Sequence, residues 1–337
     1  MSNIEIVEKQ FDFLSQDLPR PTKFIRRFQQ GNNRYYYDVK EDGSIKLYSS
    51  ATTLIRDGYA EDTTALEKWR NVLRAEGKSA EYELAFLACR GTILHFLLGE
   101  CIQGKDINLS DMRLFITENA PEITQVYLFD DVMRKDVNWL IKGVLAFMQF
   151  VKDYNVKPLA LELIMASDQY EVASPIDMVC TMTITEKGFF GEVYKSGEKK
   201  GQPKETKQER TVVAIVDFKS NNFYDKHYLQ LQLYKRIMKE NYPDLEVDCL
   251  FNWSPKDWTS TTPTYNLKEQ SDGRLDALCE VIFEQGRIKH SWKTPTVDNF
   301  ITSVSINNYG TENIFTKTPL TDYLKQFHGE RSQTDQD

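Results

Sequence analysis

The sequence has few cysteines, and none of them forms a pair suited to a metal or a disulfide. Its five cysteines, Cys89, Cys101, Cys180, Cys249 and Cys279, are widely spaced and include no C-x-x-C pair. Zinc ribbons and disulfide-stapled secreted domains need closely spaced cysteines. We therefore expect neither kind of site and interpret these thiols as buried apolar side chains.

Long apolar runs and several familiar catalytic motifs are also missing. No apolar stretch approaches the roughly 18 residues of a membrane span, and no signal sequence opens the chain. We therefore expect a cytoplasmic protein that makes no contact with a membrane. The chain contains no G-x-S-x-G, no G-x-x-x-x-G-K-[ST] and no H-E-x-x-H. These absences exclude a serine-hydrolase elbow, a fused ATPase motor and a zincin.

An overall positive charge is absent as well, because the net charge is -8. Any contact with DNA must then come from local basic surface. Such a local excess lies in residues 20–40, where lysines and arginines alternate with phenylalanines and tyrosines, a mixture suited to stacking on unpaired bases. The alternative for this segment is a solvated helix followed by a hairpin whose tyrosines pack into the core. The residues expected to contact DNA are Arg26, Arg27, Arg34, Tyr36 and, further along the chain, Lys226.

The apolar patterns that are present predict an α/β fold. We expect a central mixed β-sheet flanked by helices, with an N-terminal helical extension. Ser50 or Thr52 is expected to cap the first helix. The expected strands cover residues 160–166, 176–183, 211–218, 247–253 and 265–267, with a hairpin over 34–39 and 44–48. The other expected helices cover residues 65–76, 80–103, 132–154, 227–238 and 275–288.

One domain is expected to span residues 1–328. It divides into an N-terminal helical and hairpin part (1–155), a catalytic core (156–290) and a C-terminal extension (291–328). A polar disordered tail is expected at 329–337. Within the core, residues 195–210 are rich in lysine, glutamate and glycine and almost free of apolar side chains, which predicts a mobile hairpin tip.

An acid and a lysine end the apolar run at 211–218. Side chains at i and i+2 leave the same face of a strand, so Asp217 and Lys219 should share a face while Phe218 points into the packing. The alternative is an ordinary exposed ion pair at the end of a strand. On its own, this short motif is typical of many surfaces.

A second carboxylate, Asp177, lies in the strand expected at 176–183. If this strand pairs with 211–218, Asp177 and Asp217 meet. Two carboxylates about 4 Å apart repel by roughly 4 kcal/mol at an effective dielectric near 20, so the pair needs a cation or an extra proton. Oxygen ligands favour Mg²⁺ or Mn²⁺. Lys219 would then orient a water or stabilise the negative charge that develops during phosphodiester cleavage.

Gln230 and Tyr234 share one face of the helix expected at 227–238 and can look towards the acidic end of the sheet. The alternative is that both side chains cap backbone groups. The ordered series of an acid, an acid-x-Lys and a Gln-x-x-x-Tyr resembles the PD-(D/E)XK nuclease superfamily, in particular its RecB-like exonuclease branch.

The resemblance extends upstream of these motifs. That branch carries a metal-binding histidine on a helix, which matches His95, and an acid in the first strand, which matches Glu162. Gly91, one turn before His95, would let the helix approach the sheet. The alternatives are a core histidine and an exposed strand glutamate. Relatives with an iron–sulfur cluster place three cysteines after the Gln-x-x-x-Tyr helix, and this chain has too few there, so no cluster is expected.

The resemblance implies a restriction-endonuclease-like core and a Mg²⁺- or Mn²⁺-dependent DNA nuclease. We expect an exonuclease acting at duplex ends or on single strands during recombination, repair or replication, with a helicase, a single-strand-binding protein or an annealing protein as its partner. Two alternatives stay open: a noncatalytic DNA-binding or assembly subunit that keeps the fold, and an RNA endonuclease. The implied metal ligands are His95, Asp177, Asp217 and the Phe218 carbonyl. The implied catalytic residues are Glu162, Asp177, Asp217, Lys219, Gln230 and Tyr234.

Overall fold

The computed structural model describes residues 4–7, 9–30, 33–40, 44–220, 222–259, 261–271 and 273–291. The turn expected at 41–43 lies outside these residues. So do the tail expected at 329–337 and all but the first residue of the expected C-terminal extension.

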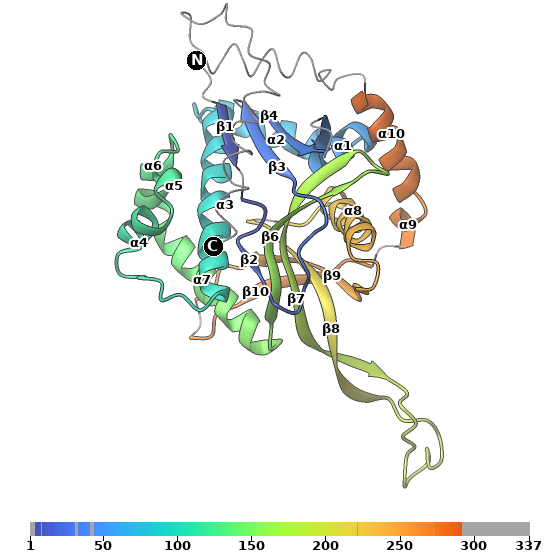
Figure 1. Cartoon of the computed structure of the whole chain (residues 1–337). Coiled ribbons are helices and arrows are strands. Elements are labelled where there is room, and N and C mark those ends of the chain that lie inside the picture. The colour runs from blue at the N-terminus through green and yellow to red at the C-terminus, as the bar shows by residue number, and fades with distance from the viewer. Residues whose placement is uncertain are drawn as a thin grey trace, which may run out of the picture.

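A mixed sheet forms the centre of the molecule (Figure 1). Strands β6 (Lys157–Ser167), β7 (Val172–Gly188) and β8 (Thr206–Phe218) run antiparallel in chain order. Helix α8 (Asp225–Asn241) then crosses over, so that β9 (Cys249–Pro255) lies parallel to β8. The edges are β10 (Tyr265–Glu269) beside β9 and β2 (Phe13–Leu14) beside β6. The expected mixed α/β sheet is confirmed.

A second group of strands precedes the helices. Strands β1 (Ile4–Val7), β3 (Arg26–Gln30), β4 (Asn33–Val39) and β5 (Ile45–Ser50) are antiparallel neighbours. The last residues of β5 pair in parallel with the start of β7, which joins this group to the central sheet. The expected hairpin is therefore confirmed. The alternative of a helix before it is wrong, because β3 pairs along its whole length with β4.

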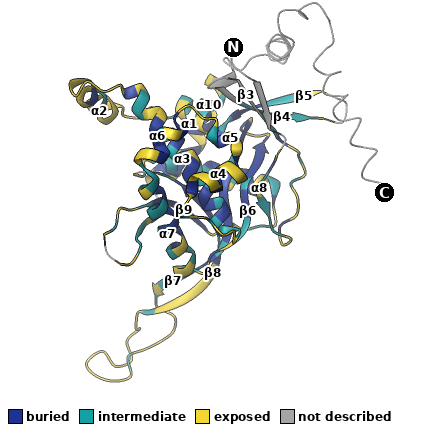
Figure 2. Cartoon of the chain, turned by 90° about the vertical axis from the view of Figure 1, so that its left-hand side faces the viewer, coloured by how far each residue is buried: buried dark blue, intermediate teal, exposed yellow. Residues whose placement is uncertain are grey.

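Helices cover both faces of the central sheet (Figures 1 and 2). Successive strand residues face opposite sides, so Met178 and Cys180 pack towards α3 and α7 while Val179 packs towards α8. One face carries α3 (Ala80–Ile102), α4 (Met112–Asn119), α5 (Pro121–Thr124), α6 (Phe129–Lys135) and α7 (Val137–Asp153). The other carries α1 (Ala51–Gly58), α8, α9 (Gly273–Asp276) and α10 (Cys279–Ser291). Helix α2 (Thr64–Ala75) stands at the periphery and is mostly exposed.

Local side-chain chemistry sets several helix ends. The Ser50 hydroxyl accepts a hydrogen bond from the Thr53 amide at 3.2 Å and caps α1, as expected. The single helix expected at 132–154 is wrong, because the chain breaks at Asp136 into α6 and α7. The Asp136 carboxylate at this break binds Arg90 at 2.7 Å, which ties α3 to the start of α7.

Helix α3 is long and apolar enough, by length and composition alone, to cross a membrane. The expectation that no stretch approaches that length is therefore wrong. The helix is apolar because it is central: Ile93, Leu94 and Leu97 are fully buried in the core. The interpretation of Gly91 is wrong too. A methyl group there would lie 4.0 Å from the nearest atom, whereas one at Gly143 of α7 would meet Leu94 at 3.0 Å.

Candidate metal centre

The candidate site lies where β7 and β8 part. Their ladder ends at the Met178 and Val216 pair, so Asp177 and Asp217 would form the next pair. The ladder is not continued there. Instead, the amide of Phe218 donates a hydrogen bond to Asp177 Oδ2 at 2.6 Å. The two strands therefore carry both acids to one place, as the sequence predicts, and a carboxylate takes the place of a backbone acceptor.

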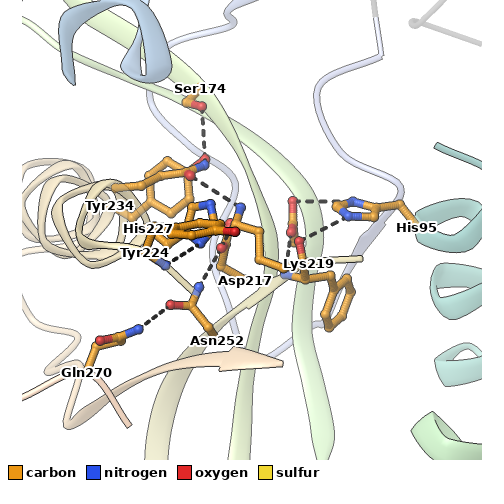
Figure 3. Close-up of polar contacts among 12 residues, drawn as sticks. His95, Ser174, Asp217, Lys219, Tyr224, His227, Tyr234, Asn252 and Gln270 are labelled. Atoms are coloured by element: carbon orange, nitrogen blue, oxygen red, sulfur yellow. Dashed lines mark hydrogen bonds and ion pairs between the residues drawn. The ribbon is translucent and has the colours of Figure 1, made fainter. Parts of the chain in front are cut away.

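His95 reaches this place from α3 (Figure 3). Its Nε2 lies 3.1 Å from the carbonyl oxygen of Phe218. A carbonyl oxygen can only accept a hydrogen bond, so Nε2 carries a hydrogen and is the donor of this bond. Nδ1 then faces Asp177 Oδ1 at 3.8 Å and Glu162 Oε1 at 3.9 Å. A histidine that binds a metal through one ring nitrogen usually donates a hydrogen bond from the other nitrogen to a carbonyl or carboxylate, which fixes the ring.

Glu162 completes the group from β6, with a strained backbone. Its φ of 49° lies in the left-handed region, which a residue other than glycine rarely adopts. The ladder with β7 pairs Leu161 and Leu163 on either side but omits Glu162 itself. This local departure turns a residue of an otherwise regular strand towards His95 and Asp177, which is why simple alternation does not reveal it.

Electrostatics make the group depend on positive charge. Burial lowers the pKa of His95, but the carboxylates of Asp177 and Glu162 outweigh burial and raise it to about 9. Burial also raises the pKa of Asp177, against the effect of His95. Three donor atoms of His95, Glu162 and Asp177 lie within 4.8 Å of one another. A proton on His95 or a bound metal ion would stabilise the carboxylates of this group.

Asp217 lies beside this group and is held by different partners. Its Oδ2 is 2.6 Å from the ammonium of Lys219 and accepts a second bond from the Asn252 amide at 2.7 Å. Burial raises the pKa of Asp217 to about 6, although Lys219 acts in the opposite direction. Its Oδ1 is buried and has no hydrogen-bond partner in the described part of the chain. Asp217 thus keeps one oxygen free for a further cation.

The Lys219 ammonium is fixed from the helix side. Gln230 Oε1 accepts from it at 3.3 Å, and Gln230 Nε2 donates to the Tyr234 hydroxyl at 2.5 Å. The Tyr234 hydroxyl also lies 3.2 Å from Ser174 Oγ. Burial, together with Asp217 and Asp177, raises the pKa of Tyr234 well above its usual value, so this hydroxyl stays neutral. Gln230 therefore contacts the lysine directly, and Tyr234 contacts it only through Gln230.

Three residues of this network were missed at the sequence level: Ser174, Asn252 and Gln270. Asn252 lies on β9 beside Asp217, and its Oδ1 accepts from Gln270 Nε2 at 2.5 Å. Both amide side chains are buried. A single amide inside the apolar run Leu250-Phe251-Asn252-Trp253 was the available signal, because a buried polar side chain needs a partner.

No family model matches the chain, and no curated protein does either.

The donor atoms fit a divalent cation. They are carboxylate oxygens, the ligand type that suits Mg²⁺ and Mn²⁺, and one imidazole nitrogen, a ligand type that suits transition metals. Ligands of one Mg²⁺ at about 2.1 Å in an octahedron lie roughly 3 Å apart, so the observed separations of 3.8 and 3.9 Å need only a small contraction. The buried, unpartnered Asp217 Oδ1 is a further carboxylate oxygen available to a cation at this place.

The grouping differs from the expected ligand set in two ways. Glu162, expected as a catalytic acid, joins His95 and Asp177, while Asp217 is not part of that close group. The Phe218 carbonyl, expected as a ligand, accepts the His95 hydrogen bond. Both differences arise because β7 and β8 separate after Val216. The Phe218 carbonyl then accepts the hydrogen bond from His95, and the Asp217 carboxylate faces Lys219.

The residues expected to contact DNA lie on three separate elements, β3, β4 and the start of α8. Tyr36 is 1% exposed and packs with Ile25 and Tyr48, so the expectation that it stacks on bases is wrong. Arg26 and Arg27 lie on β3, opposite Tyr37 and Tyr36. The side chain of Arg34 lies outside the described residues. Lys226 is 44% exposed at the start of α8 and binds Glu61 at 3.1 Å.

Proposed function

We propose that the chain is a divalent-metal-dependent nuclease of the PD-(D/E)XK kind that cleaves phosphodiester bonds in DNA. One observation carries the proposal: the Nδ1 of His95 and the carboxylates of Glu162 and Asp177 converge beside the Asp217 and Lys219 pair. The order of β6, β7, β8, α8 and β9 supports it, because each expected motif falls on the element expected for it.

The residues divide the work according to their contacts. His95, Glu162 and Asp177 would hold Mg²⁺ or Mn²⁺, with Asp217 Oδ1 as a further donor. Bound there, the cation lowers the pKa of a water and neutralises phosphate charge. The Phe218 carbonyl holds the His95 ring in position. No iron–sulfur cluster is part of this proposal.

Lys219 supplies a fixed positive charge next to the carboxylates. Its ammonium is bound by Asp217 and Gln230, and its side chain is only 19% exposed. A cation held in a site of low dielectric stabilises the negative charge that develops on a phosphate without having to reorganise. Gln230 binds this lysine and Tyr234 binds Gln230, so both residues would act by fixing the position of the ammonium.

The substrate and setting form the rest of the proposal. We propose cleavage at DNA ends or within single strands during recombination, repair or replication in the cytoplasm. The chain has no phosphate-binding loop of an ATPase, so unwinding would come from a separate helicase, with a single-strand-binding or annealing protein as another partner.

The test compares two Asp–Lys pairs of the same chain. Asp217→Asn and Lys219→Ala should each lower Mg²⁺-dependent cleavage by at least about a hundredfold, since each removes a group that acts in the transition state. Asp257 and Lys142 form an exposed pair at 2.8 Å, so Asp257→Asn and Lys142→Ala should cleave like the wild type. Circular dichroism would show that all four variants fold. Equal cleavage by the 219 and 142 variants would refute the site.

The same assay separates the alternatives. End-labelled single-stranded DNA, linear duplex, closed circles and RNA are incubated with Mg²⁺, and with EDTA as the control. Degradation of linear DNA with intact circles supports an exonuclease. Cleavage of RNA alone would identify an RNA endonuclease, and binding without any cleavage would identify a noncatalytic subunit. Mn²⁺ binding, followed by electron paramagnetic resonance, should be lost in Asp177→Asn even if no substrate is cleaved.

A further inference from the structure

Strands β7 and β8 continue well beyond the sheet as a two-stranded arm. Their ladder runs on to Gly188 and Thr206, and residues 189–205 close the far end. We call residues 184–210 the β7–β8 arm. It stands clear of the rest of the protein in both views, and it is almost entirely exposed (Figures 1 and 2). The expected hairpin tip at 195–210 is thus partly strand, since β8 begins at Thr206.

The arm holds two like charges in directly opposite positions. Lys187 and Lys207 lie directly opposite each other in the ladder. Like charges in this position destabilise a pair of strands. Within the described part of the chain, neither ammonium has a carboxylate partner. The nearby acid Glu186 is already bound by Arg210 at 2.9 Å. If the arm only faced solvent, an acidic residue in place of Lys187 or Lys207 would make it more stable. The presence of two lysines therefore suggests that the arm binds an anion.

Charge and rings along the arm fit an anionic polymer. The arm contains six lysines, one arginine and five glutamates, so its net charge is +2 although the whole chain has a net charge of -8. Phe189 is 69% exposed and Phe190 is 43% exposed at the point where the ladder ends. Lysines bind backbone phosphates, and exposed rings offer apolar contact to sugars and bases. A two-stranded ribbon also has the width that the DNA major groove accepts.

The arm has a defined reach from the candidate metal centre. Asp177 and Lys187 lie on the same strand, ten residues apart, and a strand rises about 3.3 Å per residue, which gives about 33 Å. One turn of B-DNA measures about 34 Å along its axis. The separation between the site and the lysine pair therefore matches one helical turn of a duplex.

We propose that the β7–β8 arm binds the phosphate backbone of duplex DNA about one helical turn from the phosphate that enters the site. This rests on the proposed function, because it places the same DNA molecule in both places. The arm adds a grip on the duplex that is independent of sequence. It explains how an acidic chain holds DNA without a large basic surface at the site itself.

The experiment measures duplex binding without cleavage. Fluorescence anisotropy of a labelled duplex of about 24 base pairs is recorded in EDTA at several KCl concentrations. Each phosphate contact adds about 0.9 to the slope of log K against log salt, so Lys187→Gln with Lys207→Gln should reduce the slope by about 2. The control is Lys152→Gln with Lys268→Gln, the same change of charge at exposed residues of α7 and β10. It should leave the slope unchanged.

A shortened DNA tests the reach. A hairpin with a stem of about 6 base pairs is shorter than one turn, so it should bind the wild type and the arm double variant equally. An unchanged slope in the arm double variant would overturn the proposal and leave the arm to a protein partner. If the arm double variant bound the long duplex and the short hairpin more weakly by the same factor, the assigned distance of one helical turn would be wrong.

Failure of the arm is distinguishable from failure of the proposed function. A wild type that binds duplex with the predicted slope and hydrolyses nothing would keep the arm and refute the nuclease. Normal hydrolysis by the wild type, together with an unchanged salt slope in the arm double variant, would keep the nuclease and refute the arm.

Discussion

At the scale of single residues, the amide of Asn252 decides how Asp217 is presented. Gln270 Nε2 binds Asn252 Oδ1, so the Asn252 amide nitrogen must face the carboxylate. Together with Lys219, it occupies Asp217 Oδ2 and leaves Oδ1 without a partner in the described part of the chain. Asn252 is therefore a positioning residue for the carboxylate.

Asn252→Leu keeps the volume of the side chain and removes both hydrogen bonds. Hydrogen bonds to a charged group contribute about 1.5–3 kcal/mol, and the amide of Gln270 is left buried and unpaired. We expect the free energy of unfolding in urea to fall by about 2–3 kcal/mol. The matched control is Asn266→Leu on the neighbouring β10, an exposed position that loses only a 3.3 Å hydrogen bond to Ser254, so the change should stay within about 1 kcal/mol. Equal stability of the two variants would contradict this role.

The sequence predicts the residues of the site better than their contacts. Asp217 and Lys219 were predicted to share a face because a strand alternates, and their ion pair confirms it. Glu162 was predicted as an acid of the site, but its grouping with His95 depends on a left-handed backbone that no pattern announces. Asn252 was missed because one amide in an apolar strand gives no hint of its partner.

At the scale of elements, two glycines allow α1 and α10 to touch backbone to backbone. A methyl group on Gly58 would meet the Ile282 carbonyl oxygen at 2.0 Å, and one on Gly286 would meet the Leu54 carbonyl oxygen at 2.2 Å. Real methyl groups do not approach a carbonyl so closely. The crossing seals the face of the sheet that also carries α8.

Gly286→Ala should therefore destabilise the protein. The added methyl group could be accommodated only if a backbone carbonyl or a whole helix moved. We therefore expect a loss of at least about 2 kcal/mol in the free energy of unfolding. Gly99→Ala in α3 is the control, because a methyl group there meets nothing within 4 Å. Alanine is the better helix former, and that variant should gain up to about 1 kcal/mol. Thermal melts of both variants would show opposite shifts, and shifts of the same sign would contradict the close crossing.

Most elements were predictable because their apolar periods are strong. The strand at 211–218 and the helix at 80–103 were placed within a few residues, apart from the start of β8. Strand β3 was missed because its Arg26-Arg27 start is charged, and its pairing with β4 depends on neighbours distant from any local signal. The break at Asp136 was missed for a related reason, since the Arg90 contact that accompanies it comes from another helix.

At the scale of the whole molecule, Asp168 fastens the N-terminal strands to the central sheet. Its carboxylate binds Lys23 at 2.7 Å, and Lys46 and Tyr48 at 2.8 Å each. Burial raises its pKa, but the hydrogen bonds from these three residues outweigh burial and hold the pKa well below its usual range. One turn between β6 and β7 thus gathers segments separated by more than a hundred residues.

The lowered pKa sets the pH at which this contact matters. Asp168 is protonated in the unfolded chain below about pH 3.9 and stays ionised in the folded chain to lower pH. Its stabilising contribution is therefore present above about pH 4 and is lost as the pH falls through the folded pKa. Because the side chain is 47% exposed, the contribution is at most about 1 kcal/mol.

Asp168→Asn should accordingly lower the free energy of unfolding at pH 7, and the difference from the wild type should shrink by pH 3. Urea unfolding at both values measures it, and hydrogen exchange should show faster opening of β4 and β5 at pH 7. Asp106→Asn, at an exposed aspartate of the loop after α3, should show no such difference. A deficit that grows on acidification would contradict the assigned sign.

Phe218 makes two hydrogen bonds to site residues through its main chain. Its ring packs in the hydrophobic core. Its amide binds Asp177, its carbonyl binds His95, and its ring lies 5.4 Å from that of Phe147, centroid to centroid. Every amino acid except proline supplies the same amide and carbonyl. Alanine scanning would thus score this position as a simple loss of packing. A change to the main chain, such as an ester in place of the Asp217–Phe218 amide, would remove the N–H group and expose the hold of Phe218 on Asp177.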